Sequence, residues 1–179
     1  DVVPLCSALA AQEHGDARRA LDLLRISAEL AERSESPKIT KRFVRLAQNK
    51  IEIDRIIEVV RTLPTQSKQI LLAILLQERH DNKTGGTGAI TTGEVYEIYK
   101  DLCKKTRTDA LTQRRVADLI SELDMLGIIT ARVISKGRYG RTREIKMSSS
   151  SNDIMNILKE DEVFKELTNY KIRGQTRLI

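Results

Sequence analysis

The chain has 179 residues, enough for one or two small domains that each bury a core. Its formal net charge is +6, and this whole excess lies in residues 104–146, which hold eleven basic and five acidic side chains. A local excess of this kind favours binding to a polyanion. The longest apolar runs are too short to span a bilayer and no signal peptide is visible, so we expect no membrane partner.

Cysteine and histidine usage argues against a metal site. The two cysteines, Cys6 and Cys103, lie far apart in apolar surroundings, and the two histidines are isolated. No zinc-ligand spacing is therefore present. The thiols are expected to be buried and reduced, as in an intracellular protein. Because the first residue is Asp1 and not a methionine, we expect the chain to be a fragment of a longer protein.

Residues 1–63 are expected to form a small helical bundle. The three-four spacing of apolar residues and the helix boundary signals indicate three helices. The first ends at Gly15, Thr40 is a candidate N-cap for the third, and Pro64 ends the third. The predicted helices cover residues 4–14, 16–33 and 41–63.

Residues 64–179 are expected to form a second domain, which opens with an apolar helix over residues 67–79. Thr91 and Glu94 have the spacing of a capping box, which predicts a helix from there to about Lys105. The other predicted elements are a glycine-rich loop over 80–90, a helix from Thr112 to Gly127, strands over 128–135 and 142–147, a linker over 148–153 and a helix over 153–168.

The order helix, helix, helix, strand, turn, strand in the second domain is that of a winged-helix domain. The two strands and the turn between them would form the wing, a β-hairpin that follows the recognition helix. The fold class expected from the whole sequence is therefore mainly α, with a small helical bundle followed by a winged-helix domain.

The sequence predicts no catalytic site. It lacks the phosphate-binding loop, the nucleophile elbow and the zinc-protease motif. The glycine cluster at 85–88 is not followed by a lysine and is interpreted as a loop, and the serines at 148–151 have no histidine partner. We therefore predict neither enzymatic activity nor a metal site for this chain.

The helix that begins after Thr112 is predicted to read DNA. Val116 and four further apolar residues form one stripe for the core, which leaves Arg114 and Ser121 on the opposite face. Cations in the first turn of a helix interact unfavourably with the helix dipole. A phosphate bound close by would make the arrangement favourable, because it attracts both the cations and the free N–H groups. Glutamine and arginine side chains also match the edges of adenine and guanine in the major groove. The alternative interpretation is a solvated charged face.

The turn between the two strands favours the DNA interpretation. Gly137 and Gly140 allow positive φ, and four basic side chains project from this hairpin. Such a wing reaches the minor groove or the flanking backbone while the helix occupies the major groove. The alternative is a strand edge protected by charge. The predicted DNA-binding residues are Thr112, Gln113, Arg114, Arg115, Ser121, Lys136, Gly137, Arg138, Tyr139, Arg141 and Arg143.

Four segments of the chain carry a family resemblance. They are GDARRALDLLRISAELAER from Gly15, RTLPTQSKQILLAIL from Arg61, EVYEIYKDLC from Glu94 and LTQRRVADLISELDMLGIITARVISKGRYGRTREI from Leu111. They resemble the archaeal replication initiators, which are relatives of the eukaryotic origin recognition subunits and of the related helicase loader. The resemblance covers roughly residues 9–145. It implies an AAA+ ATPase core before Asp1, followed by a lid over 1–63 and a winged helix over 64–179.

The resemblance also implies roles and partners. The family's sensor-2 motif matches residues 15–18, so Arg18 is the expected γ-phosphate contact in the intact protein, with ATP or ADP and magnesium as its cofactors. No cofactor is expected for the fragment alone. The implied partners are double-stranded origin DNA, the minichromosome maintenance helicase and other initiator copies. The implied location is the chromosome in the cytoplasm.

Two other functions stay open at this point. The winged helix could dock the helicase or another protein instead of DNA, or the chain could be a winged-helix transcription regulator. Salt discriminates the first alternative, because binding through phosphates weakens steeply with salt and binding through an apolar face does not. The lid and the sensor-2 match argue against the second, since a transcription regulator needs neither.

Overall fold

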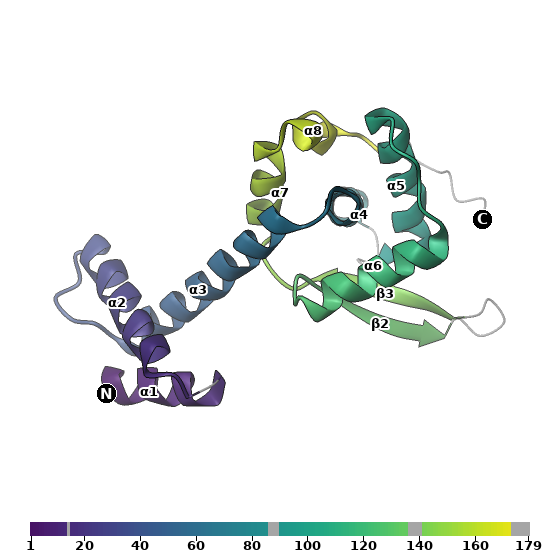
Figure 1. The fold of residues 1–179 in the computed structure, drawn as a ribbon. Helices are drawn as coiled ribbons and strands as arrows, with labels where there is room; N and C mark the ends of the chain where they lie inside the picture. Colours follow the sequence, from purple (N-terminus) through teal and green to yellow (C-terminus); the bar gives the residue numbers. More distant parts are fainter. Residues whose placement is uncertain (14, 86–89, 136–140, 173–179) are drawn as a thin grey trace. The chain divides into compact units, whose positions relative to one another are not determined.

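The computed structural model describes residues 1–13, 15–85, 90–135 and 141–172 (Figure 1). The chain divides into two compact units, Asp1–Arg55 and Ile56–Ile179. The division falls inside helix α3 (Lys41–Thr62). The domain boundary predicted after residue 63 followed the end of this helix. The units divide earlier because the last turns of α3 contribute Val60, which is fully buried, to the core of the second unit.

The first unit contains α1 (Val2–Glu13), α2 (Ala17–Arg33) and the larger part of α3. Gly15 has φ +71°, the left-handed conformation that favours glycine, at the junction of α1 and α2. Asp16 caps α2, because its Oδ1 accepts a hydrogen bond from the N–H of Arg18 at 2.9 Å. The predicted bundle of three helices is confirmed. Its core consists of Cys6, Leu23, Ile26, Val44 and Ala47.

Helix α4 (Thr65–Thr84) is the central element of the second unit. It is buried on every side from Gln69 to Gln77 and contacts α5 (Thr92–Thr106), α6 (Gln113–Met125) and α7 (Ser151–Glu160). Figure 1 shows α4 end-on with these helices around it. A helix that is apolar over most of its surface needs such neighbours, and this explains its place in the core.

The end of α4 corrects the sequence prediction. The helix continues through Thr84 and ends at Gly85, whose φ is +69°, so residues 80–84 are helical and not part of a loop. The segment from His80 to Thr84 is polar but contains neither glycine nor proline, and nothing in it stops a helix. The rest of the predicted loop, residues 86–89, lies outside the described residues.

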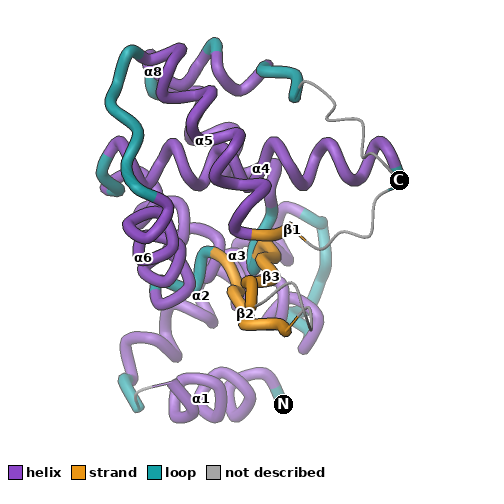
Figure 2. Tube along the Cα trace, turned by 90° about the vertical axis from the view of Figure 1, so that its right-hand side faces the viewer, coloured by secondary structure: helices purple, strands orange, loops and turns teal. Residues whose placement is uncertain are grey.

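The sheet of the second unit contains three antiparallel strands in the order β1-β3-β2. The predicted wing strands are confirmed as β2 (Ile129–Ser135) and β3 (Arg141–Met147), which pair from Ile129 with Met147 to Ser135 with Arg141. Strand β1 (Ile90–Thr91) was not predicted, because two residues show no alternation. It pairs with β3 and leads directly into α5 (Figure 2).

The C-terminal part also differs from the prediction of one long helix. It contains α7, α8 (Glu162–Lys165) and the 3-10 turn η2 (Leu167–Asn169). Asp161 breaks the helix because it caps α8 and pairs with Lys68 Nζ at 3.2 Å. The predicted serine linker is shorter as well, since Ser150 caps α7 and Ser151 begins it.

Candidate nucleic-acid interface

The predicted recognition helix is α6, and its start is held by hydrogen bonds. Thr112 is its N-cap, as predicted, with Oγ1 accepting from the N–H of Arg115 at 3.3 Å. The preceding residue, Leu111, is held by two tyrosines of α5. The hydroxyl of Tyr99 accepts from the N–H of Leu111 at 3.0 Å, and that of Tyr96 donates to its carbonyl at 3.3 Å. The position of α6 is therefore set by α5.

Tyr99 is fully buried, and its hydroxyl also donates to Oε1 of Gln66 on α4 at 2.5 Å. Burial is the largest cause that raises the pKa of Tyr99 to about 12, so this hydroxyl stays protonated at neutral pH. A protonated hydroxyl can donate to Gln66 and accept from Leu111 at the same time. Tyr99 therefore links α4, α5 and the turn into α6.

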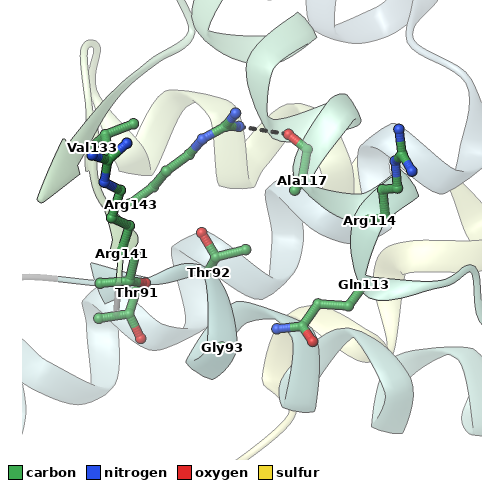
Figure 3. Close-up of a pocket in the computed structure, with 10 residues that line it drawn as sticks. Thr91, Thr92, Gly93, Gln113, Arg114, Ala117, Val133, Arg141 and Arg143 are labelled. Carbon is green, nitrogen blue, oxygen red and sulfur yellow. Dashed lines mark hydrogen bonds between the residues drawn. The ribbon is translucent and has the colours of Figure 1, made fainter. Parts of the chain in front are cut away.

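A groove of about 560 Å³ lies between the start of α5, the start of α6 and the wing strands (Figure 3). Two of its cations are exposed, Arg114 on α6 and Arg141 on β3, and neither forms an ion pair with another described residue. Figure 3 shows these two arginines on opposite sides of the start of α5. The groove is lined by Thr91, Thr92, Gly93, Gln113, Arg114, Ala117, Val133, Arg141, Thr142 and Arg143.

Two of the predicted DNA-binding residues bond to each other. The Nη1 of Arg143 donates to Oγ of Ser121 at 2.6 Å and to the carbonyl of Ala117 at 2.7 Å. Both acceptors belong to α6, and both Arg143 and Ser121 are half-buried. Arg143 lines the groove, and one nitrogen of its guanidinium, Nη1, is already engaged within the chain.

Arg115, also predicted as a DNA contact, does not line the groove. Its Nη1 lies 3.4 Å from Oε1 of Glu122, and both side chains are about half exposed. Such an exposed pair contributes little to stability. The predicted residues Lys136, Gly137, Arg138 and Tyr139 lie outside the described residues.

The start of α5 is a part of the groove that the sequence did not predict. The capping box is confirmed, since Thr91 Oγ1 accepts from the N–H of Glu94 and the Glu94 carboxylate accepts from the N–H of Thr91. The next two N–H groups, of Thr92 and Gly93, have no acceptor within the helix. Thr92 Oγ1 is buried and has no hydrogen-bond partner in the part of the chain described.

The capping box in the sequence predicted where α5 begins, but it did not predict which elements lie beside that helix start. Its place beside the wing depends on the pairing of Thr91 with Glu144 of β3, which no sequence pattern indicated. The exposed Val133 of β2 was also missed, because an apolar residue on a predicted strand is normally assigned to the core.

Arg18 lies in the first unit, in the first turn of α2. Its side chain is exposed and makes no ion pair with another residue that the structure describes, whereas its neighbour Arg19 pairs with Glu13 at 2.9 Å. Within the described ranges no three His, Cys, Asp or Glu side chains are grouped closely enough to hold a metal ion. No described helix has the length and apolar character needed to cross a bilayer.

The fold and the groove are those of a winged-helix domain that follows a helical lid, and comparisons with known proteins agree. Residues 58–157 match the family described as CDC6, C terminal winged helix domain, and residues 1–49 match the Cdc6 AAA+ ATPase-type lid domain. The chain therefore belongs to the Cdc6 family of replication proteins.

Named relatives support this assignment. The chain is 57% identical over 170 residues to ORC1-type DNA replication protein 1 of Methanosarcina mazei, which covers 95% of this chain and 40% of that protein. It is 60% identical over 177 residues to ORC1-type DNA replication protein 4 of Haloarcula marismortui, covering 99% of this chain and 33% of the relative. The chain thus spans less than half the length of these relatives.

A solved structure is also similar. The ORC1 protein of Aeropyrum pernix in complex with DNA superposes with a TM-score of 0.77 at 49% identity, and the match covers 93% of this chain and 42% of that one. The resemblance to archaeal replication initiators seen in the sequence is confirmed by these comparisons.

Proposed function

We propose that this chain is the DNA-binding part of a replication initiator and that its second unit binds double-stranded DNA at an origin. In this proposal α6 enters the major groove and the wing contacts the minor groove and the backbone. One observation carries it: Arg114 and Arg141, both exposed and unpaired among the described residues, converge with the start of α5 on one groove. The similar ORC1 protein of Aeropyrum pernix was solved in complex with DNA.

The charges of the groove suit a phosphate backbone. The free N–H groups of Thr92 and Gly93 carry the positive end of the α5 dipole, and a phosphate placed there would also lie near the guanidinium groups. The Glu94 carboxylate accepts two hydrogen bonds from Thr91, which hold it at the cap.

Base recognition is assigned to the first turn of α6. Gln113 and Arg114 are exposed at this end of the helix, and Figure 3 shows Gln113 extending toward the start of α5. Their side chains match adenine and guanine edges. A contact to a base affects one sequence, whereas a contact to a phosphate affects all duplexes, so the two residue classes can be separated by experiment.

The test is fluorescence anisotropy with an origin duplex and a scrambled duplex over a series of salt concentrations. Arg141→Ala should weaken binding to both duplexes and lower the salt slope by about one. Arg114→Ala should weaken origin binding by about 1–3 kcal/mol and scrambled binding by less. Lys159→Ala, an exposed cation of α7 outside the groove, is the matched control. Affinities and salt slopes equal to those of the unmodified chain for both Arg114→Ala and Arg141→Ala would refute the proposal.

In the intact protein the proposal extends to the nucleotide. Arg18 fits a role as the contact to the γ-phosphate of ATP, because its guanidinium is exposed and unpaired among the described residues at the start of α2. ATP with magnesium would supply the chemical energy of the AAA+ core. Arg18 would supply a positive charge that senses the presence of the γ-phosphate.

Docking of a protein is the second candidate function, and the end of α6 favours it. Met125 is 79% exposed and Leu126 is 45% exposed, which gives this end of the helix an apolar surface that phosphates do not require. The proposed partners are the minichromosome maintenance helicase and other initiator copies. Replacing Met125 with Ser should weaken helicase capture and leave DNA binding unchanged.

A further inference from the structure

Arg143 connects two elements that both have to reach DNA. Its Nη1 donates to the carbonyl of Ala117 at 2.7 Å (Figure 3) and to Oγ of Ser121 at 2.6 Å, and these hydrogen bonds join strand β3 to helix α6. Ser121 Oγ in turn donates to the same carbonyl of Ala117 at 3.0 Å. Three polar atoms thus form one closed set of hydrogen bonds.

A second tie joins the other wing strand to the same helix. Oδ1 of Asp124 accepts a hydrogen bond from the N–H of Ala131 on β2 at 3.1 Å. Strand β2 is at the edge of the sheet, so without Asp124 this N–H group would have no hydrogen-bond acceptor from a neighbouring strand. Each wing strand is therefore fastened to α6 by its own polar contact.

The acceptors of these hydrogen bonds lie along one face of α6. Ala117, Ser121 and Asp124 follow at steps of four and three residues, which places them on one side of the helix. On the strand side, Arg143 lies between Arg141 and Ile145 on one face of β3, because alternate residues of a strand share a face. Along this face exposure falls from the exposed Arg141 through the half-buried Arg143 to the fully buried Ile145.

We propose that Arg143 is a positioning residue that fixes the angle between the wing and α6, so that both engage one duplex at the same time. This inference rests on the proposed DNA-binding function and changes the role predicted for two residues. Arg143 and Ser121 act through the fold and not through phosphates. Arg141, one step further out on the same face, is the arginine that contacts the backbone.

The ordinary expectation for an arginine in a basic wing is a direct phosphate contact, and the two roles differ in what they predict. A phosphate contact adds about one to the salt slope and does not depend on Ser121. If Arg143 is a positioning residue, the contribution to the salt slope comes from Arg141. The effect of Arg143 on binding then depends on its two acceptors on α6, the Ala117 carbonyl and Ser121 Oγ. Lysine replaces arginine at a phosphate as a point charge, but its side chain is shorter and would bring its ammonium less close to the two acceptors on α6 that Arg143 Nη1 reaches.

The experiment is a double-mutant cycle on the full chain, measured by anisotropy with the origin duplex over a salt series. Ser121→Ala removes an acceptor and no charge, and it should weaken binding about fivefold. Arg143→Lys should weaken it to a similar extent although the charge is kept. Arg141→Ala should have a smaller effect in the Ser121→Ala background than in the unmodified chain, because a wing that is no longer held in place contributes less.

Thermal unfolding of each variant checks that the fold is kept. If the Arg143 variants fail to fold, the binding measured for Ser121→Ala tests the proposal in their place. The proposal is overturned if Ser121→Ala leaves binding unchanged while Arg143→Ala lowers the salt slope by about one. That outcome makes Arg143 a phosphate contact and leaves the proposed DNA binding intact. If Arg114→Ala and Arg141→Ala are also without effect, the DNA-binding proposal itself fails.

Discussion

Replacing Tyr99 with Phe tests whether the turn into α6 is held by hydrogen bonds. The substitution removes only the hydroxyl oxygen, so the ring keeps its place in the core. Two partners are left behind, the N–H of Leu111 and Oε1 of Gln66. Each lost hydrogen bond is worth about 1 kcal/mol net, which gives a loss of about 2 kcal/mol in the free energy of unfolding.

The assay is urea unfolding of the full chain followed by circular dichroism, with the Tm measured in parallel. A loss of about 2 kcal/mol corresponds to a fall in Tm of about 7 °C for a unit of this size. Tyr96→Phe is the matched control. It removes a single and longer hydrogen bond, to the carbonyl of Leu111 at 3.3 Å, and should reduce stability by about 0.5 kcal/mol. Equal stability of the Tyr99→Phe variant and the unmodified chain would refute this account of the turn.

Three further predictions concern titration and the nucleotide. The free energy of unfolding should fall between pH 10 and about pH 12, because the unfolded chain loses the Tyr99 proton near 10 and the folded chain only near 12; urea unfolding across this range should show a smaller fall for Tyr99→Phe. Arg18→Ala should leave DNA binding by this chain within about twofold, as measured by anisotropy, but should impair ATP hydrolysis in a longer protein that includes the AAA+ core. The present chain should release no phosphate from ATP above the buffer background, and release that persists through purification would contradict this.

The helices and the wing could be predicted because each has a pattern that depends only on neighbours in sequence. Thr112 and the apolar stripe from Val116 define α6, and the capping box of Thr91 and Glu94 defines α5. The elements that were missed or misplaced lack such a pattern. Strand β1 has two residues, and the break at Asp161 depends on a partner, Lys68, that is far away in sequence.

The candidate site shows the same limit. Arg114 and Arg141 could be identified as cations near a helix start and a hairpin, and the structure brings both to one groove. The partners of Arg143 could not be predicted, because they depend on which face of β3 lies against α6. A count of basic residues does not separate an arginine that is free to bind a ligand from one that is already bonded within the chain.

Two places along β3 differ in how a change there would spread through the fold. At the middle of the strand Glu144 pairs with Thr91, which is both the last residue of β1 and the cap of α5, so β1 and α5 meet with no residue between them. An insertion at that junction would separate the cap from its helix. At the first residue of the strand the ladder closes at the pair of Ser135 and Arg141, and five residues connect the strands. The length of the segment that connects two strands sets the register of a hairpin, so a change of length there would alter the pairing of β2 with β3 but would not displace a helix cap. The junction of β1 with α5 is therefore the place where a single insertion would disturb a strand, a helix start and the groove between them.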